Sequence, residues 1–185
     1  MIGISGIEYY PPLQCSGSPT GDYVSKLTTH SIAKKEMDFS SIIKTYIPHG
    51  AVYAEYTCTY DKPFVKDLVY DTCIFFKRGT PISTYISDLV ISYKNQSITP
   101  QKLKVASDIL NALNELKEHV RSMNSKGFSH NAICPKNIVY NESSKKAYLI
   151  HFDHSIYSTS DDEDNINTII QNLSDQIHRI KTDFY

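Results

Sequence analysis

The chain of 185 residues carries 19 Lys and Arg against 20 Asp and Glu, so its formal net charge is −1 at pH 7, and 41% of its residues are apolar. This length predicts one domain, or one domain with a small additional lobe, and the apolar fraction is sufficient for a buried core. The balanced charge, without a Lys/Arg cluster, argues against nucleic-acid binding, which needs a basic surface to neutralise phosphates.

Four cysteines, Cys15, Cys58, Cys73 and Cys134, are scattered along the sequence. None forms a C-x-x-C pair, and none lies near a histidine at the spacing typical of zinc ligands. We therefore expect reduced thiols in a cytoplasmic protein, because a chain of this length does not need disulfides for stability. The N-terminus shows no secretory signal, and no apolar stretch is long enough to cross a bilayer, so we expect no membrane span.

The first predicted elements are a loop, a strand and a helix. Prolines and glycines make residues 11–21 a loop, since both residue types disfavour a helix interior. Residues 23–27 are a short strand candidate. From Ser31 onward, apolar residues recur at helical intervals, and Pro48 and Gly50 end this helix.

Two strands, a turn and a helix are predicted next. Residues 51–58 and 67–76 are rich in Val, Tyr, Thr and Phe, which favours strands. Residues 77–81 have the composition of a turn, and a helix is predicted over about 82–93.

The strongest helical pattern follows, and both of its ends carry signals. Thr99 is a favourable N-cap, Pro100 occupies the first helical position, and Gly127 is a typical C-terminal glycine. The apolar stripe of this helix consists of Leu103, Ala106, Ile109, Leu110, Leu113, Leu116, Val120 and Met123.

The C-terminal part is predicted to contain a hairpin and one more helix. Residues 138–140 and 147–150 are apolar strands joined by a polar turn. The acidic run Asp161–Asp164 is interpreted as a solvated loop or helix start. The last helix is predicted over 164–180 from the spacing of its apolar residues.

The order of these elements predicts an α+β fold, because strands dominate the first part of the chain and helices the second. We expect a sheet-rich lobe over residues 1–80 and a helix-rich lobe over residues 81–185.

The segment HNAICPKN, residues 130–137, stands between the long helix and the hairpin and resembles the catalytic loop of protein kinases. His130 matches the His of the H-R-D motif, and Asn137 matches the Asn that binds a metal ion. Pro135 falls where the common pattern D-L-K-P-x-N has its proline.

Matches to other kinase elements precede this loop in the order expected for that family. The start MIGISGIEYYPPL retains Gly3 and Gly6 of the glycine-rich loop, whose first glycine falls on Met1. Lys26 in YVSKL matches the Lys that contacts the phosphates, and Glu36 in the next helix matches its ion-pair partner. The segments PPLxC and YVSKL, the lysine-rich helix start and the loop are most similar to kinase-like proteins of large cytoplasmic DNA viruses.

This resemblance covers nearly the whole chain and implies a truncated, bilobal kinase-like fold whose C-terminal lobe lacks the later helices. It implies protein partners, such as a viral capsid or another multi-subunit assembly, in the host cytoplasm or the virion. No cofactor is expected, and ATP with magnesium enters only if nucleotide binding survives.

Three positions that carry charge in kinases have lost it. The catalytic Asp falls on Ala132, whose methyl group cannot accept a proton or orient a hydroxyl. The catalytic-loop Lys falls on Cys134, and the metal-binding Asp of D-F-G falls on His151, a poor ligand for magnesium. Because phosphoryl transfer depends on positioning and electrostatics, the resemblance implies a pseudokinase. A metal ligand displaced to Asp153 is an alternative, two residues out of register.

The retained positions have structural as well as functional interpretations. We expect His130 to pack and hydrogen-bond beneath the loop, and Asn137 to hydrogen-bond the loop backbone. Lys26 and Glu36 are expected to pair, which does not by itself imply a bound nucleotide. A metal site that includes His154 lacks further ligands nearby in the sequence.

Two functional hypotheses follow. The first is a catalytically inactive kinase-like module that acts by binding partners or as a structural component. The second is a residual or atypical serine/threonine kinase, or a nucleotide-responsive switch, which would bind its nucleotide through Gly3, Gly6, Lys26, Glu36 and Asn137.

Overall fold

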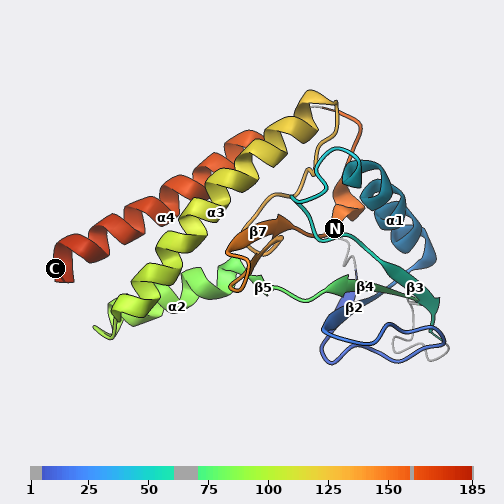
Figure 1. Ribbon diagram of the computed structural model, residues 1–185, viewed down its shortest axis with the longest axis horizontal. Helices are drawn as coiled ribbons and strands as arrows, with labels where there is room; N and C mark the ends of the chain where they lie inside the picture. Colours follow the sequence, from blue (N-terminus) through green and yellow to red (C-terminus); the bar gives the residue numbers. More distant parts are fainter. Residues whose placement is uncertain (1–5, 61–70, 159–160, 185) are drawn as a thin grey trace. The chain divides into compact units, whose positions relative to one another are not determined.

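The computed structural model spans residues 1–185 and describes residues 6–60, 71–158 and 161–184 (Figure 1). The described residues form four α-helices, seven strands and one short 3-10 helix, which confirms the predicted α+β class. They divide into two compact units, each described separately below. Unit 1 contains Met1–Tyr46, Val52–Arg78 and His151–His154, and unit 2 contains Ile47–Ala51, Gly79–Ile150 and Ser155–Tyr185.

The chain passes between the two units more than once. The sequence predicts a single boundary at residue 80, but Ile47–Ala51 belongs to unit 2 and His151–His154 belongs to unit 1. The second of these segments brings a histidine and an aspartate from late in the sequence into the unit that holds Lys26 and Glu36.

Unit 1 is built on a four-stranded antiparallel sheet in the order β1-β2-β4-β3. Its strands are β1 (Ile7–Tyr9), β2 (Tyr23–Thr28), β3 (Tyr56–Thr59) and β4 (Thr72–Lys77). Helix α1 (His30–Lys44) follows β2 directly, and Thr29 caps it by accepting a hydrogen bond from the Ile32 amide at 3.4 Å. The strand predicted over residues 23–27 is confirmed, and so is the helix predicted from Ser31.

The alternation of side chains along β4 gives the sheet two apolar faces. Ile74 and Phe76 pack on one face with Ala33 of α1. Cys73 and Phe75 point to the opposite face, where they form a second cluster with Tyr23, Leu27 and partly buried residues of the loop after β1. Lys26 has the same parity along β2 as Val24, which packs on the α1 face. Its side chain is therefore directed beneath the helix.

The strand predicted over residues 51–58 is shorter than expected, because β3 begins only at Tyr56. Val52 and Ala54 contribute to the core cluster between α1 and β4 without belonging to a strand. Their apolar character reflects this packing and not sheet pairing. Residues 61–70, which include the start of the other predicted strand, lie outside the described part of the chain.

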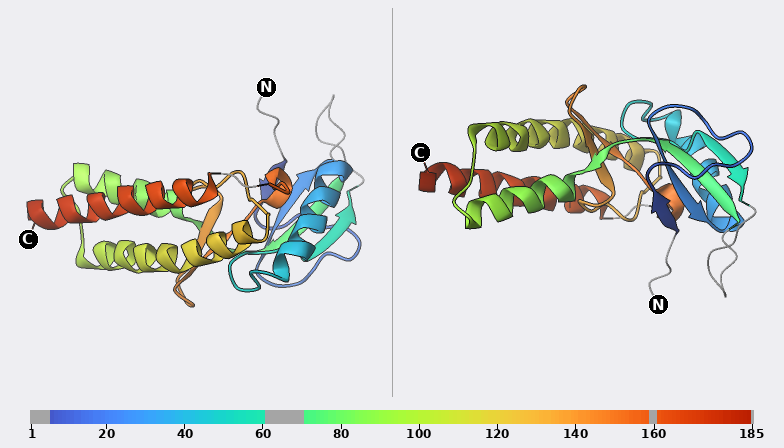
Figure 2. Two further views of the ribbon diagram at one scale, coloured as in Figure 1. Left: turned by 90° about the horizontal axis from the view of Figure 1, so that it is seen from above. Right: turned by 90° about the horizontal axis from the view of Figure 1, so that it is seen from below.

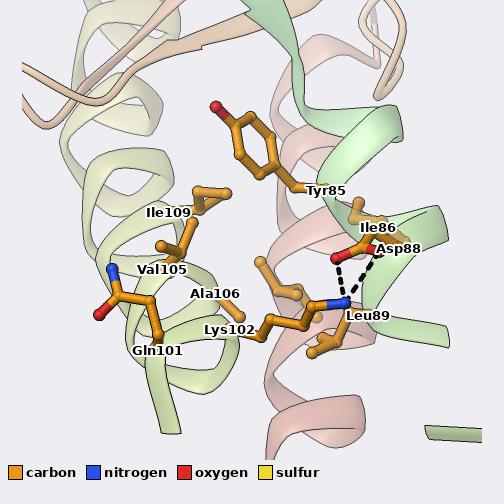
Figure 3. Close-up of a pocket in the computed structure, with 10 residues that line it drawn as sticks. Tyr85, Ile86, Asp88, Leu89, Gln101, Lys102, Val105, Ala106 and Ile109 are labelled. Carbon is orange, nitrogen blue, oxygen red and sulfur yellow. Dashed lines mark hydrogen bonds and ion pairs between the residues drawn. The ribbon is translucent and has the colours of Figure 1, made fainter. Parts of the chain in front are cut away.

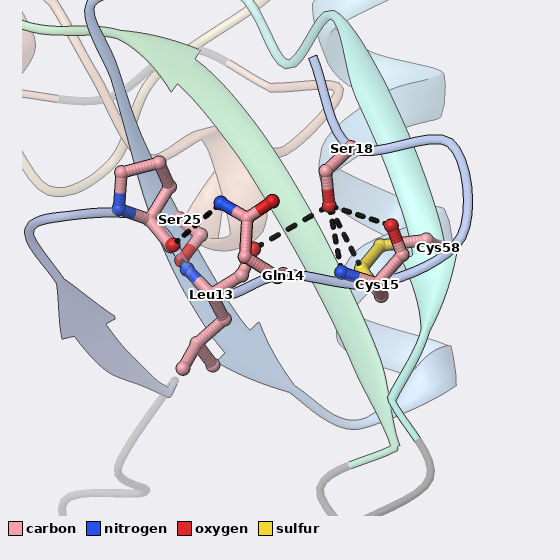
Figure 4. The surroundings of a disulfide bond; sticks show 7 residues. Leu13, Gln14, Cys15, Ser18, Ser25 and Cys58 are labelled. Carbon is pink, nitrogen blue, oxygen red and sulfur yellow. Dashed lines mark hydrogen bonds between the residues drawn. A yellow bond between two sulfur atoms is a disulfide. The ribbon is translucent and has the colours of Figure 1, made fainter. Parts of the chain in front are cut away.

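Cys15 and Cys58 form a disulfide with a Cα–Cα distance of 6.3 Å, within the normal range (Figure 4). The expectation that all the thiols are reduced is therefore wrong for this pair. Cys15 lies in the loop after β1 and Cys58 on β3, so the bond joins two segments that are distant in sequence. Cys73 and Cys134 are free thiols.

Unit 2 combines helices with a three-stranded antiparallel sheet in the order β5-β6-β7. The strands are β5 (Thr80–Pro81), β6 (Ile138–Asn141) and β7 (Lys146–Leu149), and the helices are α2 (Ile82–Lys94), α3 (Pro100–Ser125) and α4 (Asp162–Phe184). Helices α2, α3 and α4 lie side by side in both views of Figure 2. No helix in the described part of the chain has both the length and the apolarity that a membrane crossing requires.

The structure confirms the signals at the ends of α3. Thr99 Oγ1 accepts a hydrogen bond from the Lys102 amide at 3.3 Å, and Gly127 follows the helix with a φ of +77°. Two other predictions need correction. Residues 80–81, expected in a turn, pair with β6 as β5, and α4 extends beyond the predicted 164–180 at both ends.

Candidate functional site

Five ionisable side chains of unit 1 gather around the α1 face of the sheet, and we call them the ionic cluster. They are Glu8 on β1, Lys26 on β2, Glu36 on α1, and His151 and Asp153 in the returning segment that contains the 3-10 helix η1 (Phe152–His154). The alternation of side chains along the strands and the helical spacing of α1 explain why the groups of the sheet and the helix meet. Ala33, Glu36 and Ser40 are buried together on one side of α1.

Lys26 lies at the centre of the ionic cluster. Its Nζ is 2.9 Å from Glu36 Oε2 and 3.4 Å from Asp153 Oδ1, and the exposed fractions of the three side chains are 2%, 0% and 4%. A buried charge is tolerated when it is paired, since removal from water costs several kcal/mol per ion. The structure thus confirms the predicted pairing of Lys26 with Glu36 and adds Asp153 to it.

Gly6 allows the backbone of the first segment to approach Lys26 closely. Its φ is +146°, and a Cβ at this position would lie 2.7 Å from the Leu27 carbonyl oxygen and 3.1 Å from two carbons of the Lys26 side chain. Only glycine combines this dihedral angle with such close contact. Gly3, the other glycine predicted to contact a nucleotide, lies outside the described residues.

His151 provides the second cation of the cluster. Its Nε2 is 2.7 Å from Glu8 Oε1, and its Nδ1 is 3.7 Å from Glu36 Oε1. Burial works against the imidazolium, but the carboxylates of Glu36 and Glu8 outweigh it and raise the pKa of His151 to about 9. His151 is therefore protonated at neutral pH, and its interaction with Glu8 lowers the pKa of that carboxyl group.

Asp153 is ionised for a similar reason. Burial disfavours its charge, but the nearby Lys26 ammonium holds the pKa of the carboxyl group below its ordinary value. With three carboxylates and two cations, the cluster carries a formal charge of −1. Neither Glu36 Oε1 nor Asp153 Oδ1 takes part in a hydrogen bond, although both atoms are buried.

The ligand atoms of Glu36, His151 and Asp153 lie within 4.8 Å of one another, a spacing at which a metal ion could bind. Magnesium requires oxygen ligands in a near-octahedral arrangement. Here one of the three ligand atoms is an imidazole nitrogen, and the Lys26 ammonium contacts both carboxylates. This set of side chains does not fit the magnesium ion that a kinase would require.

The loop of residues 130–137 belongs to unit 2, and its own interactions hold its shape. His130 Nε2 is 2.8 Å from the Ile150 carbonyl oxygen, and Asn137 Nδ2 donates to the Ala132 carbonyl oxygen at 2.8 Å. The Ile150 amide in turn donates to the Asn137 carbonyl oxygen at 3.0 Å. The expected structural roles of His130 and Asn137 are thus confirmed.

Asp162 also anchors this loop, and the sequence analysis missed it. Its two carboxylate oxygens accept hydrogen bonds from the backbone amides of His130, at 2.6 Å, and Asn131, at 3.0 Å. The sequence predicts a solvated loop or a helix start at Asp161–Asp164, and α4 does begin at Asp162, but the side chain of Asp162 is fully buried. One signal was available, because Asp162 precedes Ile166 by four residues and continues the buried stripe of α4 toward its N-terminus.

Two other positions of this loop match charged residues of kinases in the sequence, and neither carries a charged side chain here. Ala132 and Cys134 are both partly buried. Cys134 lines a cavity of about 580 Å³ with Pro135 and residues of α4, which include Arg179. Their placement brings neither a proton acceptor nor a cation to the position that matches the catalytic centre.

A separate apolar pocket of about 160 Å³ lies in unit 2 between α2, α3 and Leu173 of α4 (Figure 3). Lys102 stands at its edge, but its Nζ already contacts Asp88 Oδ2 at 3.0 Å and Ser92 Oγ at 2.6 Å. The pocket therefore offers a ligand an apolar surface with no unpaired charge from Lys102.

No protein-family model matches this chain, and comparison with curated proteins finds no significant match. Function must therefore be inferred from the chemistry of the ionic cluster and the loop of residues 130–137.

Proposed function

We propose that this chain is a catalytically inactive, kinase-like module that acts by binding protein partners. The positions that match kinase motifs occur in the order found in kinases: Gly6, Lys26, Glu36 and then the segment HNAICPKN. This order supports the kinase-like assignment. The observation that carries the inactive assignment is Ala132, which places a methyl group where a kinase needs a carboxylate to orient the attacking hydroxyl.

The state of Lys26 supports the same proposal. A lysine that binds phosphate must present its ammonium group to the ligand, but the side chain of Lys26 is only 2% exposed and contacts two carboxylates. In this protein the contacts of Lys26 with Glu36 and Asp153 join β2, α1 and η1 within unit 1. His151 supports it further, because its imidazolium takes part in ion pairs at the position that matches the magnesium ligand.

The partner class and the location rest on the resemblance to viral kinase-like proteins. We propose a protein partner in a multi-subunit assembly, such as a virion, or in the host cytoplasm. A salt-resistant association of the chain with purified particles is the expected result. Recovery of the chain only as a free monomer from infected cells would contradict this part of the proposal.

The catalytic part is tested by phosphotransfer from radiolabelled ATP to the chain itself and to a generic protein substrate. We expect the wild-type chain and the variants Lys26→Ala and Lys26→Arg to give the same background. Transfer above background by the wild type, lost in Lys26→Arg, would overturn the proposal, because arginine preserves the charge while changing the geometry.

A nucleotide-responsive switch is the second candidate, and the sequence matches at Lys26, Glu36 and Asn137 favour it. Binding to the folded state raises apparent stability by about 2.7 kcal/mol when the ligand is at 100 times its Kd. Thermal unfolding with millimolar ATP, with and without magnesium, therefore separates the two candidates. We expect no shift. A shift present in the wild type and absent in Lys26→Arg would establish the switch and replace the binding-module proposal.

A further inference from the structure

Three cysteines converge on the face of the unit 1 sheet that is opposite α1. The Sγ atoms of Cys15, Cys58 and Cys73 all lie within 4.8 Å of one another. Cys58 and Cys73 are cross-strand partners on β3 and β4, and Cys15 reaches them from the loop after β1. In the structure Cys15 and Cys58 share a disulfide, and Cys73 is a buried free thiol beside it.

We propose that Cys15, Cys58 and Cys73 form a redox-gated site for a thiolate-bound zinc ion, which replaces the disulfide when the chain is reduced. This proposal is independent of the kinase-like assignment, because it rests only on side chains of the opposite sheet face. It assigns a role to Cys73, which the disulfide leaves unexplained.

The spacing of the three sulfur atoms suits zinc. Zn–S bonds of about 2.3 Å in a tetrahedral site place neighbouring sulfur atoms about 3.8 Å apart. Cys73 Sγ lies within 4.8 Å of the other two sulfur atoms, which is within about 1 Å of this spacing. The Cys15 and Cys58 sulfur atoms are about 2 Å apart in a disulfide, so after reduction they must move apart by roughly 1.8 Å to reach it. Soft thiolate ligands prefer zinc and copper(I) over magnesium or calcium. The fourth position of the tetrahedron remains for a water molecule.

Hydrogen bonds hold the loop that carries Cys15 in place in addition to the disulfide (Figure 4). The Leu13 amide donates to Ser25 Oγ on β2 at 2.9 Å, and the Cys15 amide donates to Ser18 Oγ at 2.7 Å. Ser18 Oγ also lies 3.6 Å from Cys15 Sγ. These contacts keep Cys15 near the sheet after reduction, and a hydroxyl beside a thiolate is typical of the groups that orient metal ligands.

An ordinary apolar role explains the cysteines less well. Cysteine behaves as a small apolar side chain, and Cys73 indeed packs with Tyr23, Leu27 and Phe75. Such packing requires no sulfur neighbours, yet Cys73 lies near both sulfur atoms of a bond that links two other segments.

The exchange of disulfide for metal balances as follows. A dithiol reductant gives two electrons and two protons to the Cys15–Cys58 bond, becomes a disulfide itself, and leaves three thiols in the chain. Burial raises the pKa of the Cys73 thiol to about 11, so this group stays protonated in the absence of metal. Zinc then displaces one proton from each thiol, three protons pass to solvent, and three Zn–S bonds form. The disulfide cross-links two segments, the loop that carries Cys15 and β3, and the zinc site adds β4 through Cys73.

The test uses the full chain in two forms, oxidised and reduced with a phosphine that is then removed without air. Zinc is titrated in competition with a chromogenic chelator, and cadmium is added separately to detect the thiolate charge-transfer band in the ultraviolet. We expect one zinc ion per reduced chain and none per oxidised chain. Stoichiometric binding that is equal in both forms, or absent from the reduced form, overturns the proposal.

Two variants with a single cysteine removed locate the site. We expect Cys73→Ala to weaken zinc binding by about 100-fold or more, because even the loss of a group that only supports a ligand costs up to that factor. Cys134→Ala, in unit 2, is the matched control and should bind as the wild type does. Equal affinities for Cys73→Ala and the wild type overturn the proposal.

A measurement on the unaltered chain covers the case in which Cys73→Ala does not fold. The reduced chain is alkylated with and without zinc, and the labelled cysteines are identified by mass spectrometry. We expect zinc to protect Cys15 and Cys58 while Cys134 reacts equally in both samples; Cys73 is buried and reacts slowly in both, so it does not serve as a reporter. Protection that excludes Cys15 or Cys58, or that extends equally to Cys134, contradicts the proposed site.

Discussion

The ionic cluster of unit 1 and the loop of residues 130–137 in unit 2 hold their shapes in opposite ways. The cluster retains ionised side chains, and almost every charge in it is paired with another inside the protein. The loop contains no internal ion pair among its described residues. It is held by hydrogen bonds to backbone groups, which Asp162, His130 and Asn137 make.

The inactive kinase-like module proposed above accounts for this difference, because such a module lacks the catalytic charges and retains the hydrogen bonds of the loop. In the cluster, charge has become structural, because Lys26 is directed at Glu36 and Asp153 and is shielded from solvent. In the loop, the backbone-binding side chains remain, but Ala132 and Cys134 bring no charge. The two regions should therefore respond differently to mutation, and the following predictions start from the largest expected effect.

Removal of one charge from the cluster should have the largest effect. We expect Lys26→Met to lower the free energy of unfolding by about 3–5 kcal/mol, because it leaves Glu36 and Asp153 buried without their cation. Denaturant unfolding at neutral pH measures this change. Lys34→Met, on the exposed side of α1, is the control and should alter stability by less than about 0.5 kcal/mol.

A double variant tests whether pairing is the cause. Replacing both partners, as in Lys26→Met with Glu36→Leu, should recover part of the loss, since Asp153 is then the one carboxylate of this contact that remains buried without the Lys26 cation. A double variant whose loss equals the sum of the two single losses would show that the residues contribute independently, which contradicts the structural role proposed for the pair.

The loop should be most sensitive at Asp162. We expect Asp162→Ala to cost about 3 kcal/mol, because it removes two charge-assisted hydrogen bonds and leaves the buried amide of His130 and the amide of Asn131 without their acceptor. Hydrogen exchange at these two amides should accelerate in the same variant. Asp164→Ala, in the exposed part of the same acidic run, is the control and should leave both measurements unchanged.

Periodicity and end signals predicted most of the elements because they depend on local sequence. Thr99, Pro100 and Gly127 mark the ends of α3 correctly, and the hairpin is found where two short apolar runs joined by a polar turn place it. Local signals failed where an apolar segment serves the core without forming a strand, as at Val52 and Ala54.

The sequence predicted only some of the contacts between residues that are far apart in the chain. The pairing of Lys26 with Glu36 was expected from the resemblance, and the structure bears it out. The inclusion of Asp153 depends on the return of residues 151–154 to unit 1, which the sequence order does not reveal. The disulfide could not be predicted for the same reason, since Cys15 and Cys58 are 43 residues apart.

The pH dependence of stability should distinguish the two regions next. His151 has a folded-state pKa of about 9 against an ordinary value of 6.5, so its contribution is full below about pH 6.5 and is lost as pH rises through about 9. We expect this loss to be on the order of 3 kcal/mol. Other groups also titrate at high pH, and the difference between wild type and His151→Gln isolates the contribution of His151.

The pKa of His151 depends on the charged groups that face its imidazole, which are Glu8, Glu36 and the Lys26 ammonium. Glu8→Gln should weaken the dependence, because it removes the closest carboxylate at 2.7 Å. His154→Gln is the control, since His154 is exposed and has no contact with Glu8 or Glu36 in the described ion pairs. Identical pH profiles for wild type and His151→Gln would contradict the assignment of a buried imidazolium.

The smallest expected effect is at Asn137, and its direction separates the two functional hypotheses. We expect Asn137→Ala to cost about 1 kcal/mol, the value of one hydrogen bond, through loss of the contact with the Ala132 carbonyl. Lys136→Ala, at the exposed neighbouring position, is the control. Asn137→Asp is more informative, because a carboxylate cannot donate to this carbonyl and should destabilise the chain at least as much as alanine does. If Asn137 served as a metal ligand, the aspartate would instead bind magnesium at least as well, and magnesium would stabilise the variant.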